Sequence, residues 1–339
     1  MNYITNEFKN KGKININELV QKFIPYKQDL NNTKINSTVN VGFTLDPGYI
    51  LETMLTAASI MATQYKTTKI VFHFGVVGDF NAKEMIKIYE LKDKINNSTE
   101  FNFYYLKGAE EKMQNFHEKG VACPGKFELP ELLPDNVERL LIFDAGDVLI
   151  FRDLTELYNY DMKDFWALGT PEPWCISEFV QIYNITKYIN IGSVLINVKK
   201  LKENSFWELY TKNRNLKVGG APDQTLFNIV VPDIRKDYFP FRFGGIVPFY
   251  TDKDSDELKF AGYGMINWLN STLAKDFPEN PLTEVKLVAQ IYNSVFIHQF
   301  CAKWSFGYGL SIFRNLAKYF IKLADIWEEI CKKMPGYCF

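Results

Sequence analysis

Short apolar, β-favouring runs alternate with helical patterns through the first part of this chain, and breaks mark the changes. At Pro47-Gly48, for example, a strand stops and apolar residues continue at helical spacing. Strands are predicted at residues 39–46, 69–74 and 101–106, and helices at 49–65, 81–91, 109–119 and 199–212. Strands that alternate with helices indicate an α/β protein in which a mostly parallel sheet carries helices on both faces.

The stretch that best locates a functional site follows the apolar run Leu140 to Phe143, which is short enough for a buried strand. This run ends in a turn, Asp144-Ala145-Gly146-Asp147, which holds two carboxylates and a glycine. Charged groups are costly near a core unless they are paired or bind a metal. The turn therefore suits a divalent cation that in turn holds a phosphate. Asp, Ala and Gly are also ordinary turn residues, and a plain tight turn is the alternative.

Charge and cysteine content narrow the class of protein. A formal net charge of −1 argues against a broad nucleic-acid surface, which needs a basic excess. The five cysteines are scattered and odd in number, as free thiols in a reducing compartment would be. The sequence has neither a secretory leader nor an apolar window of membrane-spanning length. We therefore expect a cytoplasmic protein that has no membrane span and binds no nucleic acid.

Further polar landmarks lie at predicted strand ends and helix starts, which converge at one edge of an α/β sheet. These are Lys126, Asn190, the pair Asp223-Gln224, His298 and Lys303. Two carboxylates and an imidazole suit Mn²⁺ or Mg²⁺, and lysines neutralise a departing diphosphate. Taken alone, Asp223 suits the positive end of a helix dipole and needs no further role. Together the groups predict a site that stabilises a leaving phosphate.

In their order along the chain, these motifs resemble glycosyltransferase family 8, the retaining family that includes glycogenin and galactinol synthase-like enzymes. The motifs are Phe43-Thr44-Leu45, the segment Lys126 to Pro134, Asp144 to Asp147 with Asp153, Asn190-Ile191-Gly192 with Asn197, Asp223-Gln224 with Asn228, and His298 with Lys303-Trp304. The resemblance implies a GT-A fold, with a Rossmann-like mixed, mostly parallel sheet flanked by helices and a C-terminal loop-rich and helical extension. The chain would divide into a polar and helical extension (1–37), the GT-A domain (38–305) and a C-terminal helix packed on the domain (306–339).

The same resemblance implies a role for each matching residue. The metal ligands would be Asp144, Asp147 and His298. The catalytic residues would be Asp223, Gln224 and Asn190. The nucleotide-sugar contacts would be Phe43, Thr44, Leu45, Tyr49, Lys126, Asp144, Ala145, Gly146, Asp147, Ile191, Gly192 and Lys303.

Two departures from the family pattern concern the metal and phosphate motifs. The family motif is Asp-x-Asp, whereas two residues separate Asp144 from Asp147. Either both carboxylates ligate across a tighter turn, or only Asp147 keeps the standard pose. The C-terminal motif normally has glycine where Cys301 stands, and the proline before Trp304 is missing. Neither change removes a charge that the chemistry needs.

The implied activity is metal-assisted transfer of a hexose, with retention, from UDP-glucose or UDP-galactose to an acceptor hydroxyl. Mn²⁺ or Mg²⁺ would be the cofactor, and a carbohydrate, a protein or a small polyol the acceptor; a homodimer stays open. A metal-dependent nucleotidyltransferase or sugar-nucleotide hydrolase is the alternative, because it too needs carboxylates, a cation and lysines. A non-catalytic carbohydrate-binding homologue is the third candidate.

Overall fold

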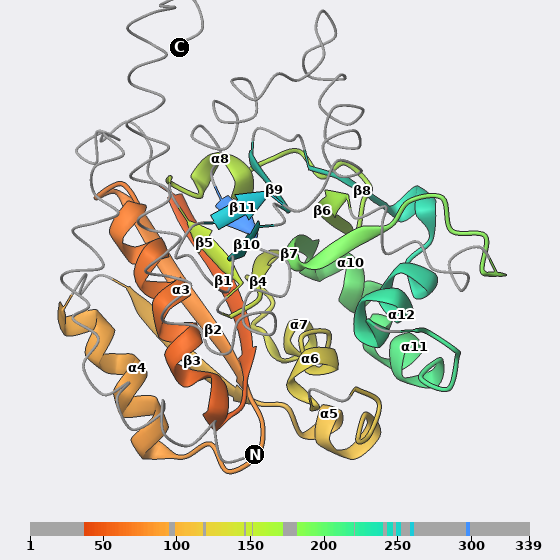
Figure 1. Ribbon diagram of the computed structural model, residues 1–339, viewed down its shortest axis with the longest axis horizontal. Helices are drawn as coiled ribbons and strands as arrows, with labels where there is room; N and C mark the ends of the chain where they lie inside the picture. Colours follow the sequence, from red (N-terminus) through yellow and green to blue (C-terminus); the bar gives the residue numbers. More distant parts are fainter. Residues whose placement is uncertain are drawn as a thin grey trace, which may run out of the picture.

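The computed structural model (Figure 1) describes residues 37–94, 99–117, 120–145, 147–150, 152–171, 182–219, 221–239, 243–246, 249–251, 258–260 and 296–298. The expected N-terminal extension, the C-terminal helix, Gly146, Cys301 and Lys303 lie outside these residues.

A seven-stranded sheet in the order β3-β2-β1-β4-β7-β6-β8 forms the centre of the molecule. Its strands are β1 (Ser37–Leu45), β2 (Thr68–Val76), β3 (Glu100–Tyr105), β4 (Arg139–Phe143), β6 (Ala167–Pro171), β7 (Ile189–Asn197) and β8 (Lys236–Tyr238). β1, β2, β3 and β4 pair in parallel, as do β6 and β8, whereas β7 runs antiparallel to both of its neighbours. The predicted mixed, mostly parallel sheet is confirmed.

Helices lie on both sides of this sheet, with α3 and α4 on one side and α5, α6, α7, α11 and α12 on the other (Figure 1). The helices are η2 (Pro47–Tyr49), α3 (Ile50–Thr63), α4 (Ala82–Lys94), α5 (Lys107–Lys112), α6 (Ala122–Gly125), α7 (Leu129–Leu132), α8 (Thr155–Tyr158), α10 (Val198–Glu203), α11 (Phe206–Lys212), α12 (Pro222–Val230) and η4 (Asp233–Arg235). Among the described helices, none is long and apolar enough to cross a membrane.

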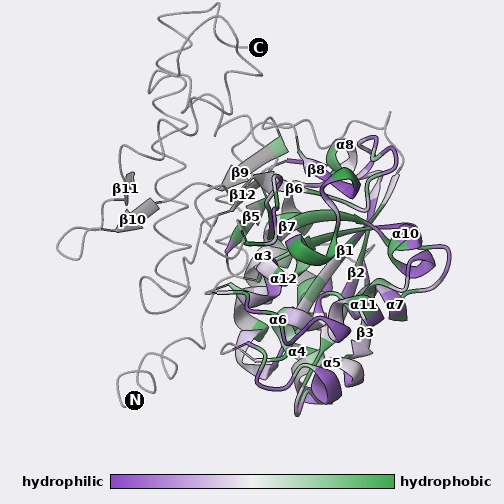
Figure 2. Cartoon of the chain, turned by 90° about the vertical axis from the view of Figure 1, so that its right-hand side faces the viewer, coloured by the Kyte–Doolittle hydropathy of each residue, from purple (hydrophilic) through white to green (hydrophobic). Residues whose placement is uncertain are grey.

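Two buried clusters of apolar side chains, one on each side of the sheet, hold these layers together. Beneath α3 and α4, Phe43 and Phe72 both stack on Phe74. On the other side, the ring of Phe127 lies 4.7 Å from that of Phe227 in α12. Each fully buried side chain of this size contributes about 1.5–3 kcal/mol to folding. In Figure 2 the hydrophobic colouring gathers on the inner strands and the hydrophilic colouring on outward-facing helices such as α5.

Two predicted helices are shorter than their sequence patterns indicated. The single helix expected around 199–212 is wrong, because the chain breaks between α10 and α11 at Ser205, whose φ is +48°. Serine competes for backbone hydrogen bonds and favours such breaks. The helix expected at 109–119 ends at Lys112, before Asn115 takes a φ of +59°.

Two smaller sheets complete the described structure. One joins β5 (Val148–Ile150), β12 (Phe296–His298) and β9 (Gly244–Ile246) in the order β5-β12-β9. The other pairs β10 (Phe249–Thr251) with β11 (Leu258–Phe260). β5 directly follows the Asp144–Asp147 turn, so the first of these sheets connects the C-terminal part of the chain to the carboxyl end of β4.

Candidate active site

The two-carboxylate turn lies at the carboxyl end of β4 and is fixed by backbone hydrogen bonds. The N–H of Asp144 donates to the carbonyl of Gly192 in β7 over 2.7 Å, and the N–H of Asp147 donates to the carbonyl of Asp144 over 3.4 Å. The Asp144 side chain is 33 % exposed, whereas Asp147 is buried with 8 % exposure. The predicted strand-end turn therefore lies directly against the glycine segment of β7.

His298 reaches the same region from more than a hundred residues away in sequence. β12 pairs with β5 antiparallel, and the Cα of His298 is the register partner of Val148, which directly follows Asp147. The backbone of the expected imidazole ligand is thus adjacent to the turn that carries both expected carboxylate ligands. Such long-range proximity is what a shared metal site requires.

Lys126, which follows α6, joins two of the predicted acidic residues. Its ammonium lies 2.9 Å from Oδ1 of Asp144 and 3.5 Å from Oδ2 of Asp223, and its side chain is only 4 % exposed. Burial acts to lower the pKa of Lys126, but the two carboxylates more than offset this effect and raise it well above its usual value. Lys126 is therefore a permanent positive charge at the carboxyl end of the sheet.

Asp223 opens α12 and is held on three sides. Besides Lys126, it accepts a hydrogen bond from Nε2 of His117 over 3.2 Å, and Tyr210 donates to its backbone carbonyl over 3.1 Å. Burial acts to raise the pKa of Asp223, but Lys126 and the hydrogen bond from His117 outweigh it and hold the pKa below its usual value. Asp223 is therefore a buried carboxylate that stays ionised at neutral pH.

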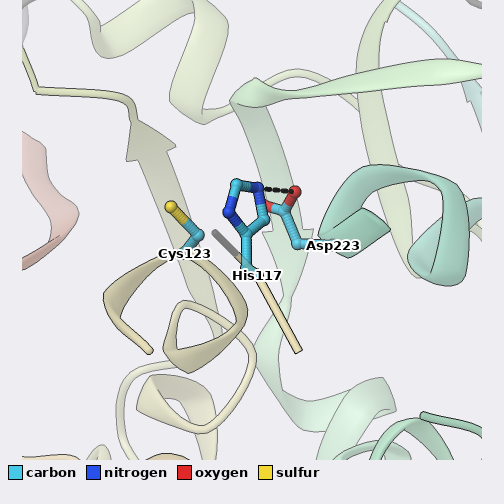
Figure 3. Close-up of side chains that lie close together, drawn as sticks. All are labelled: His117, Cys123 and Asp223. Carbon is cyan, nitrogen blue, oxygen red and sulfur yellow. Dashed lines mark ion pairs between the residues drawn. The ribbon is translucent and has the colours of Figure 1, made fainter. Parts of the chain in front are cut away.

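Cys123 adds a third potential ligand atom to this group. His117, Cys123 and Asp223 each offer one atom, all within 4.8 Å of one another, and Figure 3 shows His117 between Cys123 of α6 and Asp223 of α12. Imidazole, thiolate and carboxylate are zinc ligands in other proteins. Here both oxygens of the Asp223 carboxylate already have partners, because Oδ1 pairs with His117 and Oδ2 pairs with Lys126. We therefore interpret the cluster as an anchor for Asp223.

Hydrogen bonds from two residues of α12 hold the helix against the start of β7. Gln224 accepts from the N–H of Ile191 over 3.2 Å and donates to the hydroxyl of Tyr188 over 3.2 Å. Asn228 accepts from the N–H of Ile189 over 2.9 Å and donates to its carbonyl over 2.8 Å. These contacts fix Asp223 and Gln224 relative to β7.

Asn190 shapes the glycine segment itself. Its side-chain oxygen accepts from the N–H of Gly192 over 2.7 Å, and the carbonyl of Gly192 in turn holds Asp144. Asn190 is buried with 4 % exposure, and Ile191 is buried beside it. The structure therefore joins Asn190, Asp144, Asp223 and Gln224 into one constellation, although they come from three separate parts of the sequence.

The expected nucleotide contacts at the end of β1 divide by the direction of their side chains. Phe43 and Leu45 are fully buried in the core, so they can meet a ligand only through their backbone. Thr44 and Tyr49 are partly exposed. The sequence analysis did not identify His117 or Cys123 as site residues. Their nearness to Lys126 in the sequence is the one signal that could have found them.

A model of "Glycosyl transferase family 8" matches residues 40–240. A search of curated protein sequences finds no match. Among solved structures, an active-site mutant of LgtC has a TM-score of 0.58 at 17 % identity, covering 85 % of this chain and 95 % of that one. The galactosyltransferase LgtC with donor and acceptor sugar analogues gives 0.54 at 19 % identity, covering 88 % and 100 %.

The bifunctional glycosyltransferase WbbM gives a TM-score of 0.59 at 15 % identity, covering 87 % of this chain and 52 % of that protein. At such low identity these neighbours establish the fold alone, which is the GT-A fold of glycosyltransferases. The family match spans more than half of the sequence, including Lys126, both carboxylates of the turn and Asp223. The chain therefore belongs to glycosyltransferase family 8.

Proposed function

We propose that the protein is a retaining hexosyltransferase that takes its sugar from UDP-glucose or UDP-galactose and uses a divalent cation. The observation that carries the proposal is the buried Lys126, which bridges Asp144 at the end of β4 and Asp223 at the start of α12. In this proposal Asp144 lies beside the diphosphate of the donor and Asp223 beside its sugar. Lys126 contacts both carboxylates and so connects the two parts of the site. Enzymes that hydrolyse glycosidic bonds likewise place a pair of carboxylates beside the bond that breaks.

The donor set fits Mn²⁺ or Mg²⁺, which favour carboxylate oxygens and tolerate an imidazole. Asp147 and His298 would hold the ion, and Asp144 would share its carboxylate between Lys126 and the ion, because each carboxylate offers two oxygens. Bound there, the ion would supply Lewis-acid stabilisation of the departing diphosphate. The pairing of Asp144 with Lys126 favours Asp147 as the stronger ligand of the two.

The residues of this chain would then divide the remaining work. Lys126 adds a fixed positive charge near the diphosphate, and Asp223 orients hydroxyl groups of the transferred hexose. Gln224 is held against β7 by the hydrogen bond that it accepts from Ile191, and there it would lie beside the anomeric carbon and steady the developing positive charge. The acceptor would be a hydroxyl group of a carbohydrate, a protein or a small polyol.

Donor turnover tests this proposal directly. With Mn²⁺, the protein should release UDP from UDP-glucose or UDP-galactose, and EDTA should stop the release. Asp147→Asn should lower the rate at least about 100-fold, because a bound metal contributes several kcal/mol and each 1.4 kcal/mol is tenfold. The anomeric coupling of the product in proton NMR should match that of the donor.

Asp135→Asn is the matched control, since the Asp135 side chain is fully exposed and should leave the rate unchanged. Asp135→Asn should change the free energy of unfolding by less than about 0.5 kcal/mol, as surface substitutions do. Asp147 is buried, so the circular dichroism spectrum of Asp147→Asn should first match that of the unaltered protein before the rates are compared. Release of pyrophosphate or of a sugar phosphate in place of UDP would identify a nucleotidyltransferase or hydrolase. Full activity of Asp147→Asn would refute its role as a ligand.

A further inference from the structure

A second polar region lies on one face of the sheet, across β1, β2 and β3. On β1, β2 and β3, Asn40, His73 and Tyr104 are in contact on one face of the sheet. Their sequence neighbours Val41 and Phe72 point to the opposite face and are fully buried in the apolar core. Because side chains alternate along a strand, this contrast is built into the register of three adjacent strands.

A continuous hydrogen-bond chain crosses this face. Tyr104 contacts Nδ1 of His73 over 3.1 Å, and Nε2 of His73 contacts the side-chain oxygen of Asn40 over 2.9 Å. Asn40 donates to the hydroxyl of Tyr158 over 2.7 Å, and this hydroxyl donates to the carbonyl of Arg139 over 3.1 Å. The Asn40 oxygen only accepts, so Nε2 of His73 carries the proton and Nδ1 accepts from Tyr104.

Burial lowers the pKa of His73 to about 4, so its ring is neutral at pH 7 and adds no charge to this face. The hydrogen-bond chain therefore fixes the directions of neutral donors and acceptors and places no charge on this face. A fixed, neutral array of this kind recognises a ligand by the direction of its hydrogen bonds.

Above this face lies a cavity of about 610 Å³, which falls within the range of about 300–1,000 Å³ typical of small-molecule sites. Its wall carries four asparagine amides, from Asn40, Asn102, Asn136 and Asn159, together with hydroxyl groups. Amides and hydroxyls both donate and accept, as the hydroxyl groups of a sugar do. The lining therefore matches a ligand with many hydroxyl groups.

The charged groups of the lining cancel, since Lys69 and Arg139 are basic whereas Glu100 and Glu138 are acidic. Lys69 and Glu100 also pair with each other over 2.6 Å. With the neutral His73, the cavity has no charge excess that would select a phosphate, a carboxylate or a cation. The lining thus disfavours ionic ligands and leaves the neutral polyhydroxylated class.

The cavity is separate from the catalytic region. From Asn40 to Leu45, at the carboxyl end of β1, the strand runs five residues, or roughly 16 Å at about 3.3 Å per residue. Between them on this face, Gly42 packs against Leu140 and Leu129. Neither Asp144 nor Asp223 is among the residues that line the cavity.

We propose that this cavity is a second, non-catalytic binding site for a neutral saccharide of one or two sugar units. It is formed by Asn40, His73, Asn102 and Tyr104 on the sheet face, with Asn136 and Tyr158 at its wall. The proposal does not depend on the transfer reaction. A transferase with such a site would bind a longer saccharide away from its catalytic residues. This binding raises the effective concentration of the rest of that saccharide near the enzyme.

The test measures saccharide binding rather than activity. Maltose and lactose serve as neutral probes, and glucose 6-phosphate is the anionic comparison, with saturation-transfer NMR and titration calorimetry as readouts. Asn102→Trp, at the middle of the partly exposed sheet face, should fill the cavity and weaken binding of the neutral probe at least tenfold. Asn136→Trp, in the exposed loop at the wall, is a second blocking variant that leaves the sheet unaltered.

Asn215→Trp is the matched control, because Asn215 is exposed and does not line the cavity. It should bind the neutral probe as the unaltered protein does, and all three variants should release UDP at unaltered rates. Unchanged binding in both blocking variants would place the saccharide elsewhere and overturn the proposal. Failure of both neutral probes to bind, or tighter binding of glucose 6-phosphate, would overturn it as well.

Discussion

Replacing Lys126 with methionine tests the central interaction of the site, because it removes the ammonium and keeps most of the side-chain volume. The ammonium lies 2.9 Å from Asp144 and 3.5 Å from Asp223. Asp144 is a third exposed and can regain water, whereas the Asp223 side chain is only 9 % exposed. Breaking a buried ion pair by removing one partner costs about 3–5 kcal/mol, and most of this cost should come from Asp223.

Protonation of Asp223 sets an upper limit on that loss. The ordinary pKa of Asp is near 4, so protonating it at pH 7 costs about 4 kcal/mol, at about 1.4 kcal/mol per pH unit. At pH 5 the same protonation costs only about 1.5 kcal/mol. We therefore expect Lys126→Met to lower the free energy of unfolding by about 4 kcal/mol at pH 7 and by about 1–2 kcal/mol at pH 5.

The sign follows from the direction of the pKa change in each protein. In the unaltered protein the pKa of Asp223 is held below its unfolded value, so its contribution is present above that value and is lost only as pH falls through the lowered pKa. In Lys126→Met, burial raises the pKa of Asp223, because the charge that opposed burial is gone. Acidification from pH 7 to pH 5 should therefore stabilise the variant and leave the contribution of this pair in the unaltered protein intact.

Guanidinium unfolding followed by tryptophan fluorescence measures the free energy of unfolding of the variant and of the unaltered protein at pH 7 and at pH 5. Adding Asp223→Asn to Lys126→Met should recover part of the loss at pH 7, since the buried carboxylate is then neutral. A loss below about 1 kcal/mol at pH 7, or an equal loss at both pH values, would refute the view that Lys126 neutralises a buried charge.

Two further variants test the sheet face and the anchor of α12. Burial lowers the pKa of His73 from 6.5 to about 4, so the unfolded chain binds the extra proton in this window and stability falls by about 3 kcal/mol as pH drops from 6.5 to 4. His73→Gln should remove that part of the pH dependence in urea unfolding, and an identical pH profile would contradict it. Asn228→Ala loses three hydrogen bonds to the backbone of Ile189 and Gln224 and should cost about 3 kcal/mol. Thermal unfolding measures this loss, and an unchanged midpoint would show that α12 is held by other contacts.

Local patterns in the sequence predicted much of the α/β core. The strands β1, β2, β3 and β4 and the helices α3 and α4 were all anticipated, because a buried strand is a short apolar run and a surface helix repeats its apolar residues every three to four positions. The break at Ser205 was not anticipated, since the apolar pattern of 199–212 continues across it. Local patterns measure only what each segment prefers, and tertiary packing overrode that preference at this point.

For the site, the sequence by itself determined which chemical groups are present and that strand ends and helix starts carry them. Only the tertiary structure decided that Lys126 contacts both Asp144 and Asp223, that His117 supports Asp223, and that β12 brings His298 beside Val148. The polar cavity over β1, β2 and β3 is likewise invisible in the sequence, because Asn40, His73 and Tyr104 meet only through strand register. The physical reason is common to all of them: hydrogen bonds and ion pairs act over a few ångströms in space, and only folding decides which distant residues come that close.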